Sequence, residues 1–224
     1  MMVQDSTLEF LEDLKKNNNR EWFQANQDRY KKYKQSYKEI VEAFIAEMSK
    51  YDDSLKHLEF KNCSFRINRD IRFAKDKSPY KTNMGFWLSA GQKSSNLGGY
   101  YVHIEKGASF IAGGLYCPES GDLKKMRREI DGFYEDLEAI VTNKEFKAIY
   151  GDFDRDENNT LKTSPKGYEK DHPAIEFLRL KSFTATAKLD DSDLKDENFV
   201  AHTTQRLLVL KPLVEFINRA LTTE

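Results

Sequence analysis

The segment of residues 61–81 holds the densest group of side chains in the sequence that could bind an anion. Its seven basic residues face only two acidic ones, so the local charge is +5 in a chain whose net charge is −1. A guanidinium group binds two oxygens of a phosphate or carboxylate at once, so this cluster predicts an anion site. The basic residues are Lys61, Arg66, Arg69, Arg72, Lys75, Lys77 and Lys81.

The order of residues within this segment predicts how the side chains are arranged. Residues 65–73 alternate between apolar and polar types, which is typical of a strand with one polar face. Asp70 lies between two arginines, so we expect it to be ionised and to fix their rotamers. Arg69 falls on the apolar side, which predicts either a bulge or a buried partner. The predicted polar face carries Arg66, Asn68, Asp70 and Arg72.

A second cluster, residues 161–173, mixes turn-forming residues with cations. If it folds over the polar face of the first cluster, the two form one anion pocket, to which a helix beginning near Pro173 would add free N–H groups. Asp70 and His172 are the candidate catalytic acid or base if the bound molecule is transformed. The alternative is that the arginine and aspartate side chains form a purely structural ladder. The predicted ligand-binding residues are Arg66, Asn68, Arg69, Asp70, Arg72, Lys75, Lys77, Tyr80, Lys81, Lys162, Lys166, Tyr168 and His172.

Other motifs that would indicate a known chemistry are missing. The sequence has no phosphate-binding or dinucleotide-binding glycine loop and no Gly-x-Ser-x-Gly elbow. Its four histidines are far apart and lack zinc-site spacing. Residues 152–163 depart from a calcium loop, because Glu157 stands where glycine is needed and Thr163 where glutamate is needed. The sequence therefore predicts no metal site and indicates no particular cofactor.

The N-terminal part is predicted to be helical. Ser6 and Glu9 have the spacing of a capping box, which predicts a helix beginning there and ending at the asparagines 17–19. A long second helix is predicted over residues 20–50. Its stripe of apolar residues at steps of three and four is more typical of a core-facing helix than of a cofactor site. The stripe is Tyr30, Tyr33, Tyr37, Ile40, Phe44 and Met48.

The remainder predicts strands followed by more helices. Besides residues 65–73, strand-like runs cover 85–89, 99–105, 109–116 and 182–189, and short glycine-containing links between the earlier runs indicate an antiparallel meander. A helix is predicted over residues 120–141, and another begins after the capping box formed by Thr142 and Glu145. A further helix is predicted over 193–221, with a break near Pro212. We therefore predict one α+β domain over residues 1–224, with an antiparallel sheet of about four to five strands packed against N-terminal and C-terminal helices.

Composition limits the class of protein. With aromatic residues at 12% the chain is not typical of a disordered protein, and its longest apolar block, residues 207–210, is too short to cross a membrane. The two cysteines form no disulfide or zinc pattern, so we expect two thiols in a reducing compartment. The first residues lack the pattern of a signal peptide, which favours a cytoplasmic protein without a membrane partner.

Several segments resemble one uncharacterised family. Residues 69–83, RDIRFAKDKSPYKTN, are similar to the signature of domain of unknown function 2461, which occurs in bacteria and fungi. Residues 165–168 (PKGY) and 171–173 (DHP) resemble its second signature, and residues 18–23 and 113–116 also match. Ile71 and Ala74 replace the Thr and Ser expected there, without loss of a charged group. The resemblance spans nearly the whole chain and implies one intact domain, with no established activity, substrate or cofactor.

Three hypotheses for the function remain. The leading one is a site for a phosphorylated or otherwise anionic small molecule on the basic face, extended by acid–base or phosphoryl chemistry if the protein is an enzyme. The second is nucleic-acid binding through the same face, with Tyr80, Phe73 or Trp87 stacking on bases; the net charge of −1 argues weakly against it. The third is a non-enzymatic protein-interaction module whose charged strand is structural.

Overall fold

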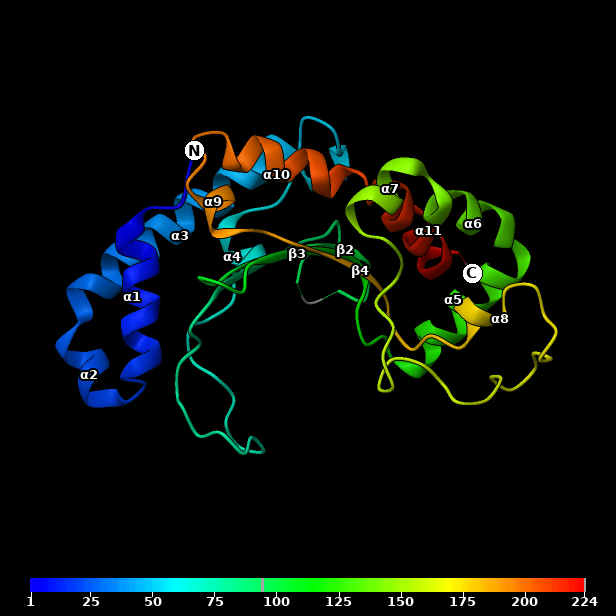
Figure 1. The fold of residues 1–224 in the computed structure, drawn as a ribbon, viewed down its shortest axis with the longest axis horizontal. Coiled ribbons are helices and arrows are strands. Elements are labelled where there is room, and N and C mark those ends of the chain that lie inside the picture. Colours follow the sequence, from blue (N-terminus) through cyan, green and yellow to red (C-terminus); the bar gives the residue numbers. More distant parts are fainter. Residues whose placement is uncertain (94, 224) are drawn as a thin grey trace. The chain divides into compact units, whose positions relative to one another are not determined.

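A computed structural model of the protein describes residues 1–93 and 95–223. The described chain contains one antiparallel sheet in the order β1-β2-β3-β4, together with helices before and after it in the sequence (Figure 1). The strands are β1 (Met84–Leu88), β2 (Gly99–Ile104), β3 (Phe110–Leu115) and β4 (Phe183–Lys188). The predicted α+β class and the meander are confirmed.

The predicted strand over residues 65–73 is wrong. Only isolated bridges pair this region, Ser64 with Phe86 and Asn68 with Tyr80. Beyond Arg69, local hydrogen bonds between side chains and the backbone replace the ladder that a strand would form. Phe73, expected on a covered apolar face, is 96% exposed. Alternating residue types predict a strand only where one face is buried, and here neither face is.

Contacts divide the described chain into two compact units, each built from three separate stretches of sequence. Unit 1 comprises residues 1–88, 101–111 and 188–205, and unit 2 comprises 89–100, 112–187 and 206–224. The single folding domain expected from the sequence remains a prediction.

Unit 1 is built around its N-terminal helices, of which α1 (Asp5–Lys16) packs against α3 (Gln27–Met48). The apolar stripe on α3 faces the core as predicted, because all its members except the half-buried Tyr30 are buried. The predicted helix over residues 20–50 is two helices, since Asn26 ends α2 (Arg20–Ala25). The shorter elements of this unit are η1 (Asp53–Leu55), α4 (Phe60–Cys63), α9 (Asp191–Leu194) and the first part of α10 (Phe199–Leu208).

Two predicted helix caps are replaced by neighbouring residues. The first helix begins at Asp5 after an extended Gln4, and the Ser6 capping box does not form. The Thr142 capping box also gives way, because the Asn143 side chain accepts the N–H groups of Glu145 and Phe146. Asparagine competes well for an N-cap position, which explains the shift from Thr142 to Asn143. The two N-caps lie two residues and one residue from the predicted positions, within the ordinary uncertainty of helix ends.

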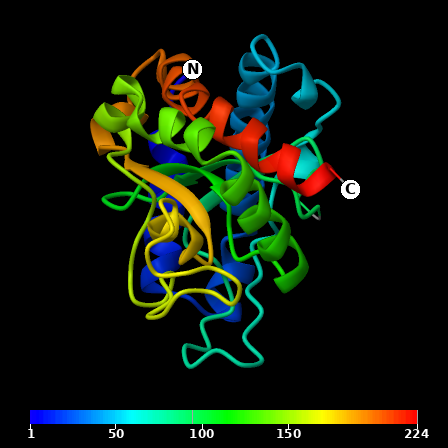
Figure 2. The same ribbon diagram turned by 90° about the vertical axis from the view of Figure 1, so that its right-hand side faces the viewer.

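Unit 2 contains a group of helices, of which α11 (Lys211–Thr222) packs on α5 (Ser120–Gly132) and α6 (Tyr134–Thr142). Figure 2 shows α11 in red beside α5 in green. The predicted break near Pro212 is confirmed, since this proline occupies the first turn of α11. The shorter helices are α7 (Lys144–Ile149) and α8 (Ile175–Leu178). No helix in residues 1–93 and 95–223 is both long and apolar enough to span a bilayer.

Candidate functional site

The basic hairpin (residues 66–81) is an irregular two-armed loop of unit 1 that precedes β1. Backbone hydrogen bonds join its arms, from Arg69 N–H to the Pro79 carbonyl at 2.9 Å and from Lys81 N–H to the Ile67 carbonyl at 2.7 Å. Figures 1 and 2 show the arms, in teal, projecting away from β1. The two arms are therefore held together although they form no regular strand.

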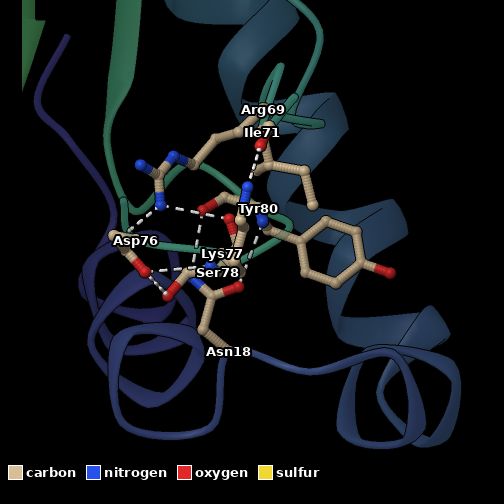
Figure 3. Close-up of polar contacts among 7 residues, drawn as sticks. All are labelled: Asn18, Arg69, Ile71, Asp76, Lys77, Ser78 and Tyr80. Atoms are coloured by element: carbon tan, nitrogen blue, oxygen red, sulfur yellow. Dashed lines mark hydrogen bonds and ion pairs between the residues drawn. The ribbon is translucent and has the colours of Figure 1, made fainter. Parts of the chain in front are cut away.

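Asn18 anchors the returning arm of the hairpin. Its side-chain amide donates to the Tyr80 carbonyl at 2.9 Å and accepts the Tyr80 N–H at 3.0 Å, as Figure 3 shows. The Tyr80 ring is buried and stacks on Phe23, with ring centroids 4.0 Å apart. The ring that the sequence suggested for ligand contact or base stacking is therefore covered by the protein.

The Arg69 guanidinium binds oxygen atoms within the hairpin itself (Figure 3). Its Nη1 donates to Asp76 Oδ2 at 2.5 Å and to the Ser78 carbonyl at 3.1 Å. The Asp76 carboxylate also accepts the Ser78 hydroxyl and N–H, and these bonds together with Arg69 hold its pKa well below its ordinary value. The partner expected for Arg69 is therefore present, although Asp76 is exposed rather than buried.

Asp70 and Arg72 form a second closed pair. Arg72 Nε and Nη2 donate to the two Asp70 oxygens at 3.0 and 2.7 Å. The hydrogen bonds from Arg72 lower the pKa of Asp70, assisted by the charge of Arg66, which supports its predicted ionised state. This carboxylate occupies two of the five N–H donors of Arg72 and offsets its charge, which weakens its attraction for an anion, and a low pKa makes Asp70 a weak base.

Two cations of the hairpin, Arg66 and Lys75, are held by no hydrogen bond or ion pair among the described residues. Lys77 donates to the Ile71 carbonyl at 2.9 Å, whereas Arg66 and Lys75 are exposed and form no ion pair with any described residue. Phe73 lies at the tip, where the Arg72 guanidinium is 5.9 Å from its ring centroid. The hairpin therefore presents two available cations and one exposed aromatic ring.

The second predicted cluster lies in unit 2, where His172 is fully hydrogen-bonded. Its Nε2 is 2.9 Å from Asp131 Oδ1, and its Nδ1 accepts the Ala174 N–H at 3.1 Å. Neither ring nitrogen is thus open to a substrate. The helix that Pro173 precedes, α8, has only four residues, and the Ala174 and Ile175 N–H groups are already bonded to His172.

The other members of this cluster form an exposed loop. The Tyr168 ring contacts His172 edge-on at 5.7 Å, and burial followed by the charge of Asp131 raises the pKa of its phenol. Lys166 is exposed, and Lys162 borders a shallow depression of about 370 Å³ together with Arg155 and Arg179, among other residues. Since the two clusters belong to different units, the single pocket expected to join them remains a prediction.

A polar chain that the sequence reading missed lies on β2 in unit 1. Tyr100, Val102 and Ile104 are buried, and the alternating positions carry a hydrogen-bonded series. Tyr101 Oη lies 3.2 Å from His103 Nδ1, and His103 Nε2 lies 3.3 Å from Glu105 Oε2. Lys15 Nζ donates to Glu105 Oε1 at 2.8 Å. We call this series the β2 chain.

The surroundings of the β2 chain shift the pKa values of its side chains. Burial lowers the pKa of His103 against the opposing effect of Glu105, and burial raises the pKa of Tyr101. Burial alone would raise the pKa of Glu105, but hydrogen bonds from Lys15 and His103 lower it. At neutral pH the chain therefore contains a phenol, a neutral imidazole, a carboxylate and an ammonium. The sequence pattern that could have revealed the β2 chain was the i, i+2, i+4 spacing of Tyr101, His103 and Glu105 on a predicted strand.

A family model described as conserved hypothetical protein (DUF2461) matches residues 6–216. The chain belongs to this family. The resemblance noted in the hairpin and in residues 165–173 is thereby confirmed, and no curated protein or solved structure matches the chain.

The matched part of this DUF2461 protein includes the basic hairpin, the second cluster and the β2 chain. Within the described residues, no group of three or more histidine, cysteine, aspartate or glutamate side chains could hold a metal ion. Both cysteines are thiols, with Cys63 buried and Cys117 exposed.

Proposed function

We propose that the basic hairpin binds a phosphorylated or otherwise anionic small molecule through Arg66 and Lys75. The observation that carries this proposal is the division of charge inside the hairpin. Arg69, Arg72 and Lys77 are engaged by oxygen atoms of the hairpin itself, whereas Arg66 and Lys75 are exposed and form no hydrogen bond or ion pair with a described residue. Internal pairing orders the loop, and the two remaining cations then provide charge for a ligand.

The anchoring of the hairpin supports the same proposal. The Asn18–Tyr80 hydrogen bonds and the Tyr80–Phe23 stack hold one arm, and the Asp76 carboxylate ties Arg69 to Ser78 near the tip. A loop held at both places loses less conformational entropy when it binds an anion than a mobile loop would. Lys162 and Lys166 of the second cluster stay candidates for a further contribution.

Calorimetric titration at low salt with inorganic pyrophosphate, ATP and glucose 6-phosphate tests this function. We expect at least one to bind, and the double variant Arg66→Ala/Lys75→Ala to weaken that binding at least tenfold. The control Lys16→Ala/Lys34→Ala removes the same charge from exposed helix positions and should bind as the wild type does. Absence of binding by the wild type, or equal losses in the two double variants, would refute the proposal.

Nucleic-acid binding is the second candidate, and the 96% exposure of Phe73 at the hairpin tip favours it. An exposed ring beside cations suits stacking on an unpaired base. The test is the affinity for single-stranded oligonucleotides as salt is raised, with Phe73→Ala beside Phe133→Ala as a matched exposed-ring control. A steep salt dependence and a loss confined to Phe73→Ala would support it, and the absence of a gel shift at low salt would exclude it.

Two further parts of the proposal concern the location of the protein and the number of its folding domains. The thiol state of Cys63 and Cys117 supports a cytoplasmic location, where thiols stay reduced. The interleaving of the two units along the chain supports a single folding domain, because neither unit is a continuous stretch of sequence.

A further inference from the structure

The β2 chain has the arrangement of a nucleophile, a base and a group that orients the base. In such arrangements a hydroxyl hydrogen-bonds to an imidazole, whose second nitrogen faces a carboxylate. Here Tyr101 Oη lies 3.2 Å from His103 Nδ1, and His103 Nε2 lies 3.3 Å from Glu105 Oε2. The proposed anion site plays no part in this arrangement, so the inference does not rest on it.

The protonation of the imidazole follows from its surroundings. Since burial lowers the pKa of His103, the ring is neutral at pH 7 and carries one N–H. The Glu105 carboxylate faces Nε2, so that nitrogen holds the proton and donates it. Nδ1 then has a lone pair directed at the Tyr101 hydroxyl, which places a base where it can take the phenol proton.

Neighbouring groups hold each member in place. The His103 ring stacks on Phe110 with centroids 4.6 Å apart and planes 12° apart, and Lys15 binds the far oxygen of Glu105. The Tyr101 hydroxyl lies over Gly85, where a Cβ atom would come within 2.3 Å of it. Glycine at position 85 therefore leaves the space that the hydroxyl occupies.

We propose that Tyr101 is a nucleophile activated by His103, with Glu105 and Lys15 as positioning residues, and that its substrate is a carboxylic ester. The Tyr101 oxygen bonds to the ester carbonyl carbon while its proton moves to His103 Nδ1. The ester C–O bond then breaks, and His103 returns that proton to the departing alkoxide. Water cleaves the resulting tyrosyl ester with His103 again as the base, which releases the acid and restores the phenol.

The walls around Tyr101 indicate this substrate class. The rings of Phe65 and Phe110 flank it, with centroids 6.5 and 5.7 Å from its own. Apolar walls suit an uncharged ester better than a phosphoryl group, whose oxygens need cations around the attacked atom.

Labelling with 4-methylbenzenesulfonyl fluoride tests the nucleophile in the intact chain, because this probe transfers its sulfonyl group to an activated phenol and releases fluoride. Peptide mass spectrometry should show Tyr101 modified at least tenfold faster than Tyr30. Tyr30 is an internal control, since burial also raises its pKa and its hydroxyl has no hydrogen bond among the described residues. Equal rates at the two tyrosines would overturn the proposal without any variant being made.

Three variants and a second probe separate activation from simple exposure. His103→Gln should reduce labelling of Tyr101 to the Tyr30 rate while the circular dichroism spectrum stays unchanged, and Glu105→Gln should reduce it partly. Hydrolysis of p-nitrophenyl butyrate by the wild type should fall at least tenfold in Tyr101→Phe. Labelling that persists in His103→Gln, or ester hydrolysis that persists in Tyr101→Phe, would overturn the assignment.

Discussion

Removal of one buried hydroxyl, in Tyr37→Phe, should loosen the attachment of the basic hairpin to the sheet. The Tyr37 hydroxyl donates to the carbonyl of Gly85 in β1 and accepts the N–H of Phe65 at 3.1 Å, just before the hairpin. Tyr37 itself is 5% exposed. The substitution leaves both backbone groups without these bonds and creates almost no cavity.

The expected cost follows from the two bonds. Loss of the bond at the buried Gly85 carbonyl costs about 1–3 kcal/mol, and loss of the bond at the more accessible Phe65 N–H costs about 0.5–1.5 kcal/mol. The free energy of unfolding should thus fall by roughly 2–4 kcal/mol. With a urea m-value of about 3 kcal/mol/M, the unfolding midpoint should drop by about 1 M with m unchanged.

Tyr33→Phe is the matched control on the same helix. Tyr33 is equally buried, and its hydroxyl makes no hydrogen bond within the described residues. Its removal should change stability by less than about 0.5 kcal/mol, since no bond is lost. Urea unfolding of the two variants tests the contribution of the Tyr37 hydroxyl. Equal unfolding midpoints would show that its hydrogen bonds contribute nothing beyond burial of the ring.

Further predictions concern the hairpin, the β2 chain and the folding unit. Asn18→Ala removes both bonds to the Tyr80 backbone and should cost about 1–2 kcal/mol, with faster tryptic cleavage within residues 69–77 than in wild type. Because the folded pKa of Asp76 lies below its ordinary value of 3.8, its stabilisation is present above about pH 4 and lost as pH falls further, so the stability difference between wild type and Asp76→Asn should shrink in that range. Gly85→Ala should displace the Tyr101 hydroxyl, lower stability by about 1–3 kcal/mol and slow sulfonyl labelling of Tyr101; unchanged labelling would contradict the geometry. Trp22 and Trp87 both lie in unit 1, whereas helices of both units contribute to circular dichroism, so a single domain predicts coincident urea transitions by the two signals and separate domains predict distinct ones.

Helices and the sheet were largely predictable because their signals are local and repeated. The stripe on α3 recurs over many turns, so a single misplaced cap changes little. The failure at residues 65–73 has a physical cause, since alternation of residue types says nothing about whether a partner strand covers the segment. Asp70, Asp76 and Lys77 bind nearby backbone instead and close the loop locally.

The candidate site was predictable as a set of residues but not as a set of available charges. Sequence counting gave +5 for residues 61–81, but the pairing of Arg69 with Asp76 and of Arg72 with Asp70 depends on the turn that joins the arms. His172 illustrates the same limit, because its partner Asp131 is 41 residues away. Local spacing cannot show which of two charged groups is already neutralised.

Charge density and chemical reactivity therefore point to different parts of unit 1. The hairpin is rich in charge, yet hydrogen bonds from Ser78 and Arg69 lower the pKa of Asp76, and those from Arg72 lower the pKa of Asp70, which makes these carboxylates weak proton acceptors. The β2 chain has less charge but contains a neutral imidazole beside a phenol, held from behind by an ion pair. A proton acceptor near neutral pH needs a lone pair that nothing else occupies, and His103 Nδ1 shares its lone pair only with the Tyr101 hydroxyl. Binding through Arg66 and Lys75 and chemistry at Tyr101 are thus separable properties, because no hydrogen bond or ion pair among the described residues joins the two groups.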